Sequence, residues 1–164
     1  MEIMGNTKTS SMTPIRYVCF GLSLLGIPIT AYLTIAHFTS PEILACPSTA
    51  AINCAKVTSS AESYFLGIPV AVLGLAFFTY LSILNSPWGF SQTNLRVPRL
   101  GSMFFGVAFV LWLISAELLI IQSICLWCTA VHVITVVIFA IVVYDYFTES
   151  PDEILRRSPN SSHS

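Results

Sequence analysis

The sequence predicts an all-α integral membrane protein, a four-helix bundle with an outward-facing loop between its first two helices. Of the 164 residues, 55% are apolar and only 9% are charged, whereas an ordinary soluble domain has roughly 25% charged residues. The charges leave four long gaps, at residues 17–41, 63–95, 100–116 and 118–144. A bilayer-crossing helix needs about 20 mainly apolar residues, and a membrane barrel would need short strands of alternating polarity instead.

We expect the four membrane-spanning helices at residues 16–38, 64–84, 100–121 and 123–146. Each is about 30 Å long at 1.5 Å rise per residue. Pro28 lies inside the first and Pro69 near the start of the second, which membrane helices tolerate better than soluble ones. The spans form one domain, residues 16–147, flanked by cytoplasmic tails at 1–15 and 148–164. The polar end of the second tail is expected to be disordered.

The basic residues predict the orientation of the bundle, because positively charged connections stay on the cytoplasmic side. Lys56 lies in the first connection, residues 39–63, which is therefore expected to face outward with the turn near Gln122. An alternative is that the first apolar segment is a cleaved signal, but it is longer than the 7–15 residues of a signal core. The other six basic residues fall in the two tails and the second connection: Lys8, Arg16, Arg96, Arg99, Arg156 and Arg157.

Cys125 and Cys128 stand at the start of the fourth span, three residues apart on one helix face, where their sulfurs can bond. Unpaired backbone N–H groups and the helix dipole stabilise a thiolate there. Such a pair can cycle between dithiol and disulfide. Cys19, near the inner end of the first span, is expected to be inert apolar packing.

Cys46 and Cys54 enclose seven mainly small or turn-forming residues, so the two cysteines can reach disulfide distance. One interpretation is a structural staple of the loop in a non-enzymatic four-span protein. Another is a four-thiolate metal site, because Cys-x-x-Cys is half of a zinc ligand set; eight-residue spacing and an oxidising compartment argue against a metal. The third is a redox relay, since both cysteine pairs are expected at one membrane face.

This ordered set of motifs resembles the vitamin K epoxide reductase family, particularly its bacterial stand-alone four-span members. In that family a loop cysteine pair follows the first span, a serine comes shortly after, and Cys-x-x-Cys opens the last core helix beside a quinone. The corresponding features here are Cys46 to Cys54, Ser59-Ser60 and Cys125-Leu126-Trp127-Cys128. The resemblance covers residues 16–147. Another class of quinone-linked disulfide enzymes carries its two pairs in the reverse order.

The resemblance implies a quinone-dependent thiol-disulfide oxidoreductase in the bacterial plasma membrane that supports oxidative disulfide formation. Cys46 would meet the thiol of a partner, Cys54 would exchange with Cys125, and Cys128 would reduce a quinone of the menaquinone, ubiquinone or phylloquinone type. Many relatives carry a fused thioredoxin domain, so this shorter chain is expected to use a separate thioredoxin-like (DsbA-like) protein. The sequence gives no indication of nucleic acid or nucleotide binding, because it has few basic residues and no phosphate-binding loop.

Three further residues are candidates for contacting the quinone: Ser60, Glu117 and His132. Ser60 resembles the loop serine of the family, while Ser59 and Glu62 fit a capping box at the start of the second span. An intramembrane carboxylate such as Glu117 is a functional hypothesis, and the alternative is a neutral carboxyl bonded to the backbone. His132 lies one turn beyond Cys128 and suits either a quinone contact or an interhelical hydrogen bond.

Reduction of vitamin K epoxide is the alternative activity, and two departures from the eukaryotic members argue against it. The asparagine on their second span has no counterpart within residues 64–84. Their tyrosine four residues beyond the second cysteine of Cys-x-x-Cys is His132 here. Oxidation of partner thiols is therefore the favoured reaction.

Overall fold

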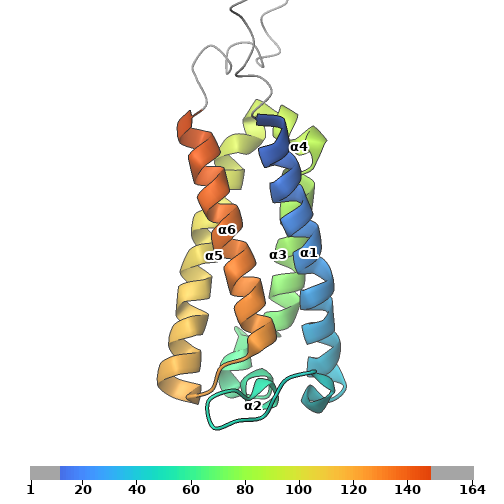
Figure 1. Ribbon diagram of the computed structural model, residues 1–164, viewed down its shortest axis with the longest axis vertical. Helices are drawn as coiled ribbons and strands as arrows, with labels where there is room; N and C mark the ends of the chain where they lie inside the picture. Colours follow the sequence, from blue (N-terminus) through green and yellow to red (C-terminus); the bar gives the residue numbers. More distant parts are fainter. Residues whose placement is uncertain (1–11, 149–164) are drawn as a thin grey trace, which may run out of the picture.

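The structure, a computed structural model, describes residues 12–148, and four helices run along its long axis (Figure 1). The helix α1 packs mainly against α3 and α6, and α6 also packs against α5. The contacts between α3 and α5 are fewer, which leaves room between these two helices. The four helices are α1 (Met12–Phe38), α3 (Val70–Leu84), α5 (Arg96–Ser115) and α6 (Leu126–Thr148).

Three of the predicted spans are confirmed as helices of sufficient length and apolar character to cross a membrane: Pro14–Phe38, Arg96–Ile121 and Leu126–Thr148. The second of these ends in a π-helical segment, η4 (Ala116–Ile121). The last begins three residues later than predicted, because Gln122, in a left-handed conformation, starts a turn that reverses the chain before Leu126. The predicted tails at 1–11 and 149–164 lie outside the described residues.

The prediction for the second span is wrong at its start. Residues 64–69 form a small antiparallel hairpin, β1 (Tyr64–Phe65) and β2 (Ile68–Pro69), in place of a helix. The helix α3 begins after Pro69 and has 15 residues, a length of about 22 Å. Two local features explain the late start. A residue that precedes proline avoids helical backbone angles. Leu66 and Gly67 both have positive φ, and these two residues close the turn of the hairpin.

Short segments close the two ends of the bundle. At one end, the connection after α1 contains η1 (Pro41–Ile43), α2 (Cys54–Thr58) and η2 (Ala61–Ser63), and it lies beside the turn between η4 and α6 (Figure 1). We call this the cysteine end. At the opposite end are α4 (Pro87–Ser91), η3 (Thr93–Leu95), the start of α1 and the end of α6.

The predicted capping box at Ser59 is wrong, because Ser59 ends α2 and does not begin the next helix. It is the C-cap residue of α2, and its hydroxyl donates to the carbonyl oxygen of Ala55 at 2.8 Å. A serine hydroxyl that binds the carbonyl four residues earlier belongs to the turn before it. Glu62 therefore has no capping partner in Ser59.

Two buried clusters form the interior. The cluster nearer the opposite end contains Cys19, which is fully buried among apolar side chains of α1, α3, α5 and α6, as the sequence predicted for this cysteine. The other four cysteines contact the second cluster, at the cysteine end. Many large apolar side chains on the outside of the helices are exposed, among them Leu24, Phe105 and Leu119. Such a surface suits a lipid environment.

Candidate functional site

The cysteine end brings four cysteines into contact with one apolar cluster, although these cysteines are spread over more than half of residues 16–147. Cys54 and Cys125 are buried members of the cluster, and Cys46 and Cys128 pack against it. Cys46 and Cys54 form a disulfide, with their Cα atoms 6.1 Å apart. Cys125 and Cys128 are thiols. The expected gathering of both pairs at one end of the bundle is confirmed.

A backbone bridge joins the segments that precede the two buried cysteines. Ile52 and Ile124 pair as in a parallel sheet. The Asn53 N–H donates to the Ile124 carbonyl at 3.1 Å, and the Ile124 N–H donates to the Ala51 carbonyl at 2.9 Å. Asn53 directly precedes Cys54, and Ile124 directly precedes Cys125. The bridge therefore sets the distance between Cys54 and Cys125, the two cysteines that were predicted to take part in disulfide exchange.

Cys125 lies immediately before α6, in the position of a helix cap. The backbone N–H of Cys128 donates to the sulfur of Cys125 at 3.2 Å. A cap residue normally accepts such a bond through oxygen, since the first N–H groups of a helix have no intrahelical partner. Here the acceptor is the sulfur of Cys125.

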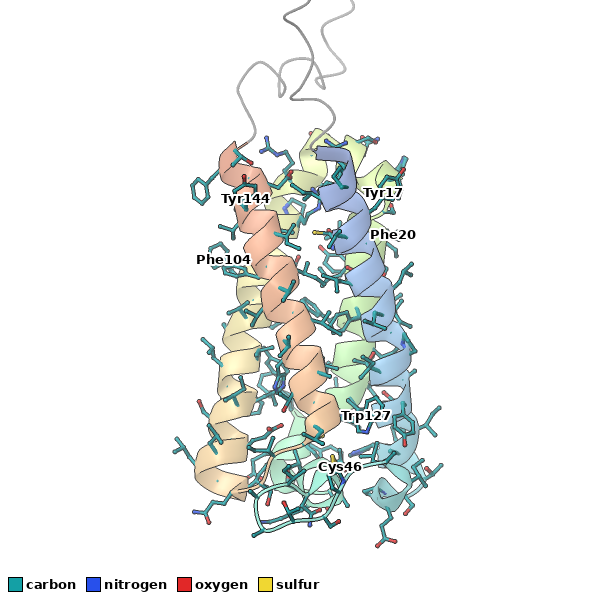
Figure 2. All side chains as sticks on the ribbon, viewed as in Figure 1. Tyr17, Phe20, Cys46, Phe104, Trp127 and Tyr144 are labelled. Carbon is teal, nitrogen blue, oxygen red and sulfur yellow. A yellow bond between two sulfur atoms is a disulfide. The ribbon has the colours of Figure 1, made fainter. Side chains whose placement is uncertain are left out.

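Aromatic side chains hold the loop against the bundle. The indole of Trp127 donates to the Ala45 carbonyl at 3.1 Å, and its ring forms a T-shaped contact with Tyr32 at a centroid distance of 5.1 Å. The Tyr32 hydroxyl donates to the Ile43 carbonyl at 2.7 Å and accepts from the Ala45 N–H at 3.0 Å. Figure 2 shows Trp127 and Cys46 close to one another at the cysteine end. The residues before Cys46 are thus bound to both α1 and α6.

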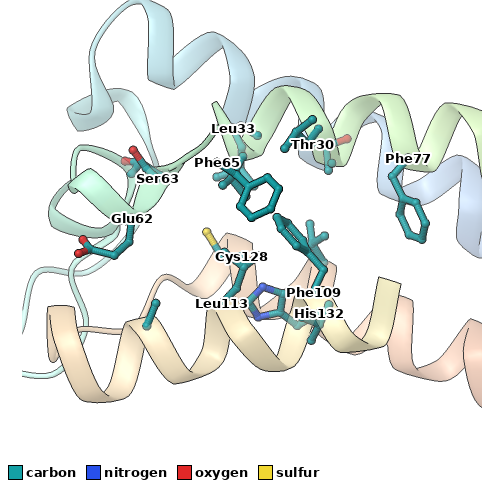
Figure 3. Close-up of a pocket in the computed structure, with 18 of the residues that line it drawn as sticks. Thr30, Leu33, Glu62, Ser63, Phe65, Phe77, Phe109, Leu113, Cys128 and His132 are labelled. Carbon is teal, nitrogen blue, oxygen red and sulfur yellow. The ribbon is translucent and has the colours of Figure 1, made fainter. Parts of the chain in front are cut away.

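A cavity of about 360 Å³ lies inside the bundle, mainly between α3 and α5, and Cys128 is part of its wall (Figure 3). Its walls are mostly aliphatic and aromatic, and a few polar side chains are spread among them. Cys125 does not line it. Side chains labelled in Figure 3 illustrate the mixture: Thr30, Leu33, Phe65, Phe77, Phe109, Leu113 and His132.

Two of the three predicted pocket residues line the cavity. Glu117 and His132 are both buried, with 6% and 5% of their surface exposed. The carboxyl group of Glu117 interacts with the backbone of Cys125. Glu117 also lies in the π-helical segment, a distortion that is common at functional sites. One carboxylate therefore joins the cavity to the Cys125–Cys128 pair.

Ser60, the third predicted pocket residue, does not line the cavity. Its hydroxyl donates to the Val57 carbonyl at 2.8 Å, which turns the side chain towards the end of α2. Ser63, three residues later, lines the cavity instead, together with Glu62. The predicted helix beginning at residue 64 is replaced by η2 and the hairpin. Ser60 and Ser63 therefore lie in other positions than that helix would give them.

His37 lines the cavity and was not among the predicted site residues. Its Nδ1 lies 3.1 Å from the Thr58 carbonyl oxygen and its Nε2 lies 3.0 Å from the Tyr64 hydroxyl. The ring therefore joins α1, α2 and the hairpin at the edge of the cavity. Helical spacing could have indicated this residue, because Thr30, Leu33 and His37 follow an i, i+3, i+7 pattern on one face of α1.

The four cysteines do not form a metal centre in this arrangement, because two of the sulfurs are bonded to each other. Within residues 12–148, no group of three or more His, Cys, Asp or Glu side chains is placed to hold a metal ion. Exchange between a disulfide and a nearby dithiol is the chemistry that this sulfur arrangement allows.

The sequence profile of the vitamin K epoxide reductase family matches residues 17–143. The matched region runs from the first turns of α1 almost to the end of α6, and it contains all four cysteines of the cysteine end. No curated protein matches the chain significantly.

Proposed function

The chain belongs to the vitamin K epoxide reductase family of membrane oxidoreductases, and on that premise we propose that it oxidises a soluble thioredoxin-like protein and reduces a membrane quinone. Electrons would pass from the partner to Cys46 and Cys54, then to Cys125 and Cys128. The observation that carries this proposal is the position of Cys128, which belongs to the cysteine end and also forms part of the cavity wall.

The exposure of the loop pair supports Cys46 as the cysteine that the partner attacks. Cys46 is partly exposed, whereas Cys54 is buried, and both border a surface depression near Glu42. A partner thiolate attacks the Cys46 sulfur, forming a mixed disulfide and releasing Cys54 as a thiolate. A second partner thiol then attacks the mixed disulfide, so the partner leaves with a disulfide and the loop pair becomes a dithiol.

Transfer to the second pair follows the same chemistry when Cys125 and Cys128 are oxidised. The Cys54 thiolate attacks the Cys125 sulfur, and Cys128 leaves as a thiolate. The Cys46 thiolate then attacks Cys54, re-forms the loop disulfide and releases Cys125. Because Cys54 and Cys125 lie in one buried cluster and their preceding residues are bridged, this exchange requires little rearrangement of the backbone.

The cavity suits a quinone in size and in lining. Its volume of about 360 Å³ falls in the range of about 300–1,000 Å³ of small-ligand pockets. The aromatic walls, including Phe77 and Phe109, would pack against a flat ring, and the buried His132 would hydrogen-bond a carbonyl oxygen. When bound, a quinone supplies an acceptor for the two electrons and two protons of the Cys125–Cys128 dithiol.

The position of Glu117 supports a role in transferring a proton of that dithiol. Glu117 lines the same cavity as Cys128, and its carboxyl group interacts with the backbone of Cys125. We propose that Glu117 accepts a proton from the dithiol as the thiolate forms. The π-helical segment supports this role, because it lets Glu117 turn inward while its neighbours Leu118 and Leu119 remain exposed.

We further propose that α3 crosses the membrane with the other three helices and that the cysteine end faces the extracytoplasmic side of the plasma membrane. Arg16, Arg96 and Arg99 lie in the first two turns of α1 and α5 at the opposite end, which supports a cytoplasmic location for that end. Labelling of Cys46 in intact cells by a membrane-impermeant maleimide, after mild reduction, tests this orientation.

The decisive experiment supplies purified protein in lipid with a reduced thioredoxin-like protein and several quinones, and follows quinone absorbance. We expect turnover by the unmodified protein and none by Cys128→Ala. Cys19→Ala is the matched control, because Cys19 packs in the other cluster, and we expect it to retain activity. Normal quinone reduction by folded Cys128→Ala would refute the proposal, whereas a staple would predict no turnover in any variant.

A further inference from the structure

We propose that Lys56 is a positioning residue for disulfide exchange between the two cysteine pairs. Its side chain attaches α2, which begins with Cys54, to the turn that leads to Cys125. The inference rests on the proposed function, because it concerns one step of that electron path.

The attachment consists of two hydrogen bonds from the ammonium group. The Nζ atom of Lys56 donates to the carbonyl oxygen of Ile121 at 2.6 Å and to the hydroxyl of Ser123 at 3.2 Å. Lys56 lies two residues after Cys54, and Ser123 lies two residues before Cys125. The bonds therefore join the immediate neighbourhoods of the two cysteines.

The carbonyl that Lys56 binds is at a favourable place for a cation. Ile121 is the last residue of the π-helical segment η4, where carbonyl groups lack intrahelical partners and the negative end of the helix dipole lies. The chain reverses just beyond it, since the N–H groups of Gln122 and Ser123 both donate back to the Glu117 carbonyl. Lys56 thus stabilises the turn at the point where the chain leaves η4.

The position of Lys56 complements the backbone bridge on the other side of Cys54. The bridge between Ile52 and Ile124 holds the residues before Cys54, and Lys56 holds the residues after it. A single attachment would let α2 rotate about the bridge. Two attachments on opposite sides of Cys54 set the direction in which its sulfur faces Cys125, and attack on a disulfide depends strongly on such alignment.

The affected step is the attack of the Cys54 thiolate on the Cys125 sulfur. The Cys54–Cys125 bond forms, the Cys125–Cys128 bond breaks, and its electron pair leaves with Cys128 as a thiolate. Lys56 is not a catalytic residue in this step, because its ammonium binds a carbonyl and a hydroxyl and not a sulfur.

The first test isolates the Cys54–Cys125 pair without any quinone or partner. In a Cys46→Ala, Cys128→Ala background, diamide oxidises the two remaining thiols of the cysteine end, and mass spectrometry of unreduced peptides measures the Cys54–Cys125 disulfide over time. We expect Lys56→Met to slow this disulfide at least tenfold. Lys56→Arg retains a donor and is expected to stay within about threefold of lysine. Equal rates for Lys56→Met and the lysine protein would overturn the proposal.

The second test separates positioning from general support of the fold. With Cys46 and Cys54 both replaced by Ala, dithiothreitol reduces Cys125–Cys128 without the loop pair. In this background we expect Lys56→Met to reduce quinone at the same rate as the protein that keeps Lys56. In the protein that keeps all its cysteines, by contrast, partner-driven turnover should fall in Lys56→Met.

A comparable loss in both assays would show that Lys56 supports the fold, which overturns the proposal. Failure of the proposal for Lys56 can also be distinguished from failure of the proposed function. Absence of quinone reduction by the unmodified protein would refute the proposed function, while the diamide comparison still decides the role of Lys56.

Discussion

The indole nitrogen of Trp127 lies 3.1 Å from the carbonyl oxygen of Ala45. Trp127 stands between the two cysteines of the Cys125–Cys128 pair, so this contact links that pair to the loop cysteines. Cys46 follows Ala45 directly. The contact therefore holds the partly exposed cysteine of the loop against the first turn of α6, and Tyr32 adds a second attachment to the same segment.

Trp127→Phe should loosen this segment without unfolding the bundle, because an aromatic ring remains and the N–H donor is lost. A typical hydrogen bond contributes about 0.5–1.5 kcal/mol, so local opening should become roughly 2- to 13-fold more frequent. Hydrogen exchange of peptides covering residues 39–53 measures it. Trp88→Phe, at the exposed opposite end, is the control. Unchanged exchange in Trp127→Phe would contradict the assigned contact.

Gly106→Ala should narrow the cavity. A Cβ at this position would lie 2.5 Å from the Cζ atom of Phe77, so the Phe77 ring has to move, and this ring lines the cavity. Overpacking of this kind costs about 1–3 kcal/mol, and we expect the KM for quinone to rise at least about fivefold. Gly101→Ala is the matched control, because nothing lies within 4 Å of its added Cβ. Equal KM values in steady-state assays of the two variants would count against quinone binding in this cavity.

Glu117→Gln should slow quinone reduction while preserving the fold. The amide keeps the size and polarity of the carboxyl group beside Cys125, but the side chain can no longer take a proton from the dithiol. Loss of a general acid–base group lowers rates by about 10²–10⁴. Pre-steady-state mixing of reduced enzyme with quinone measures the step, and Glu117→Asp, which keeps a carboxylate, should recover part of the rate. A Gln variant as fast as the original protein would exclude the proton transfer.

His132→Phe should weaken quinone binding. Phenylalanine fills the buried site but has no nitrogen to bond a carbonyl oxygen. Loss of one hydrogen bond predicts a KM increase of roughly 2- to 13-fold. His132→Gln retains a donor and should show a smaller increase in the same assay. If both variants keep the original KM, His132 has only a packing role.

The sequence by itself determined the membrane class, three of the helices, and the grouping of the cysteines. These features follow from local patterns: charge-free lengths, and two cysteines at i and i+3 that share a helix face whatever surrounds them. The convergence of the loop pair on Cys125 was also predictable, because the two helices that separate them return the chain to the same end of the bundle.

Only the tertiary structure decided which side chains reach the cavity and where α3 begins. Ser60 turns away and His37 turns in because the hairpin at residues 64–69, and not a helix, follows the loop. The contact between Lys56 and Ile121 joins residues 65 positions apart, and no periodicity encodes it. Such contacts depend on how separate segments pack, and a pattern within one segment carries no information about the packing of another.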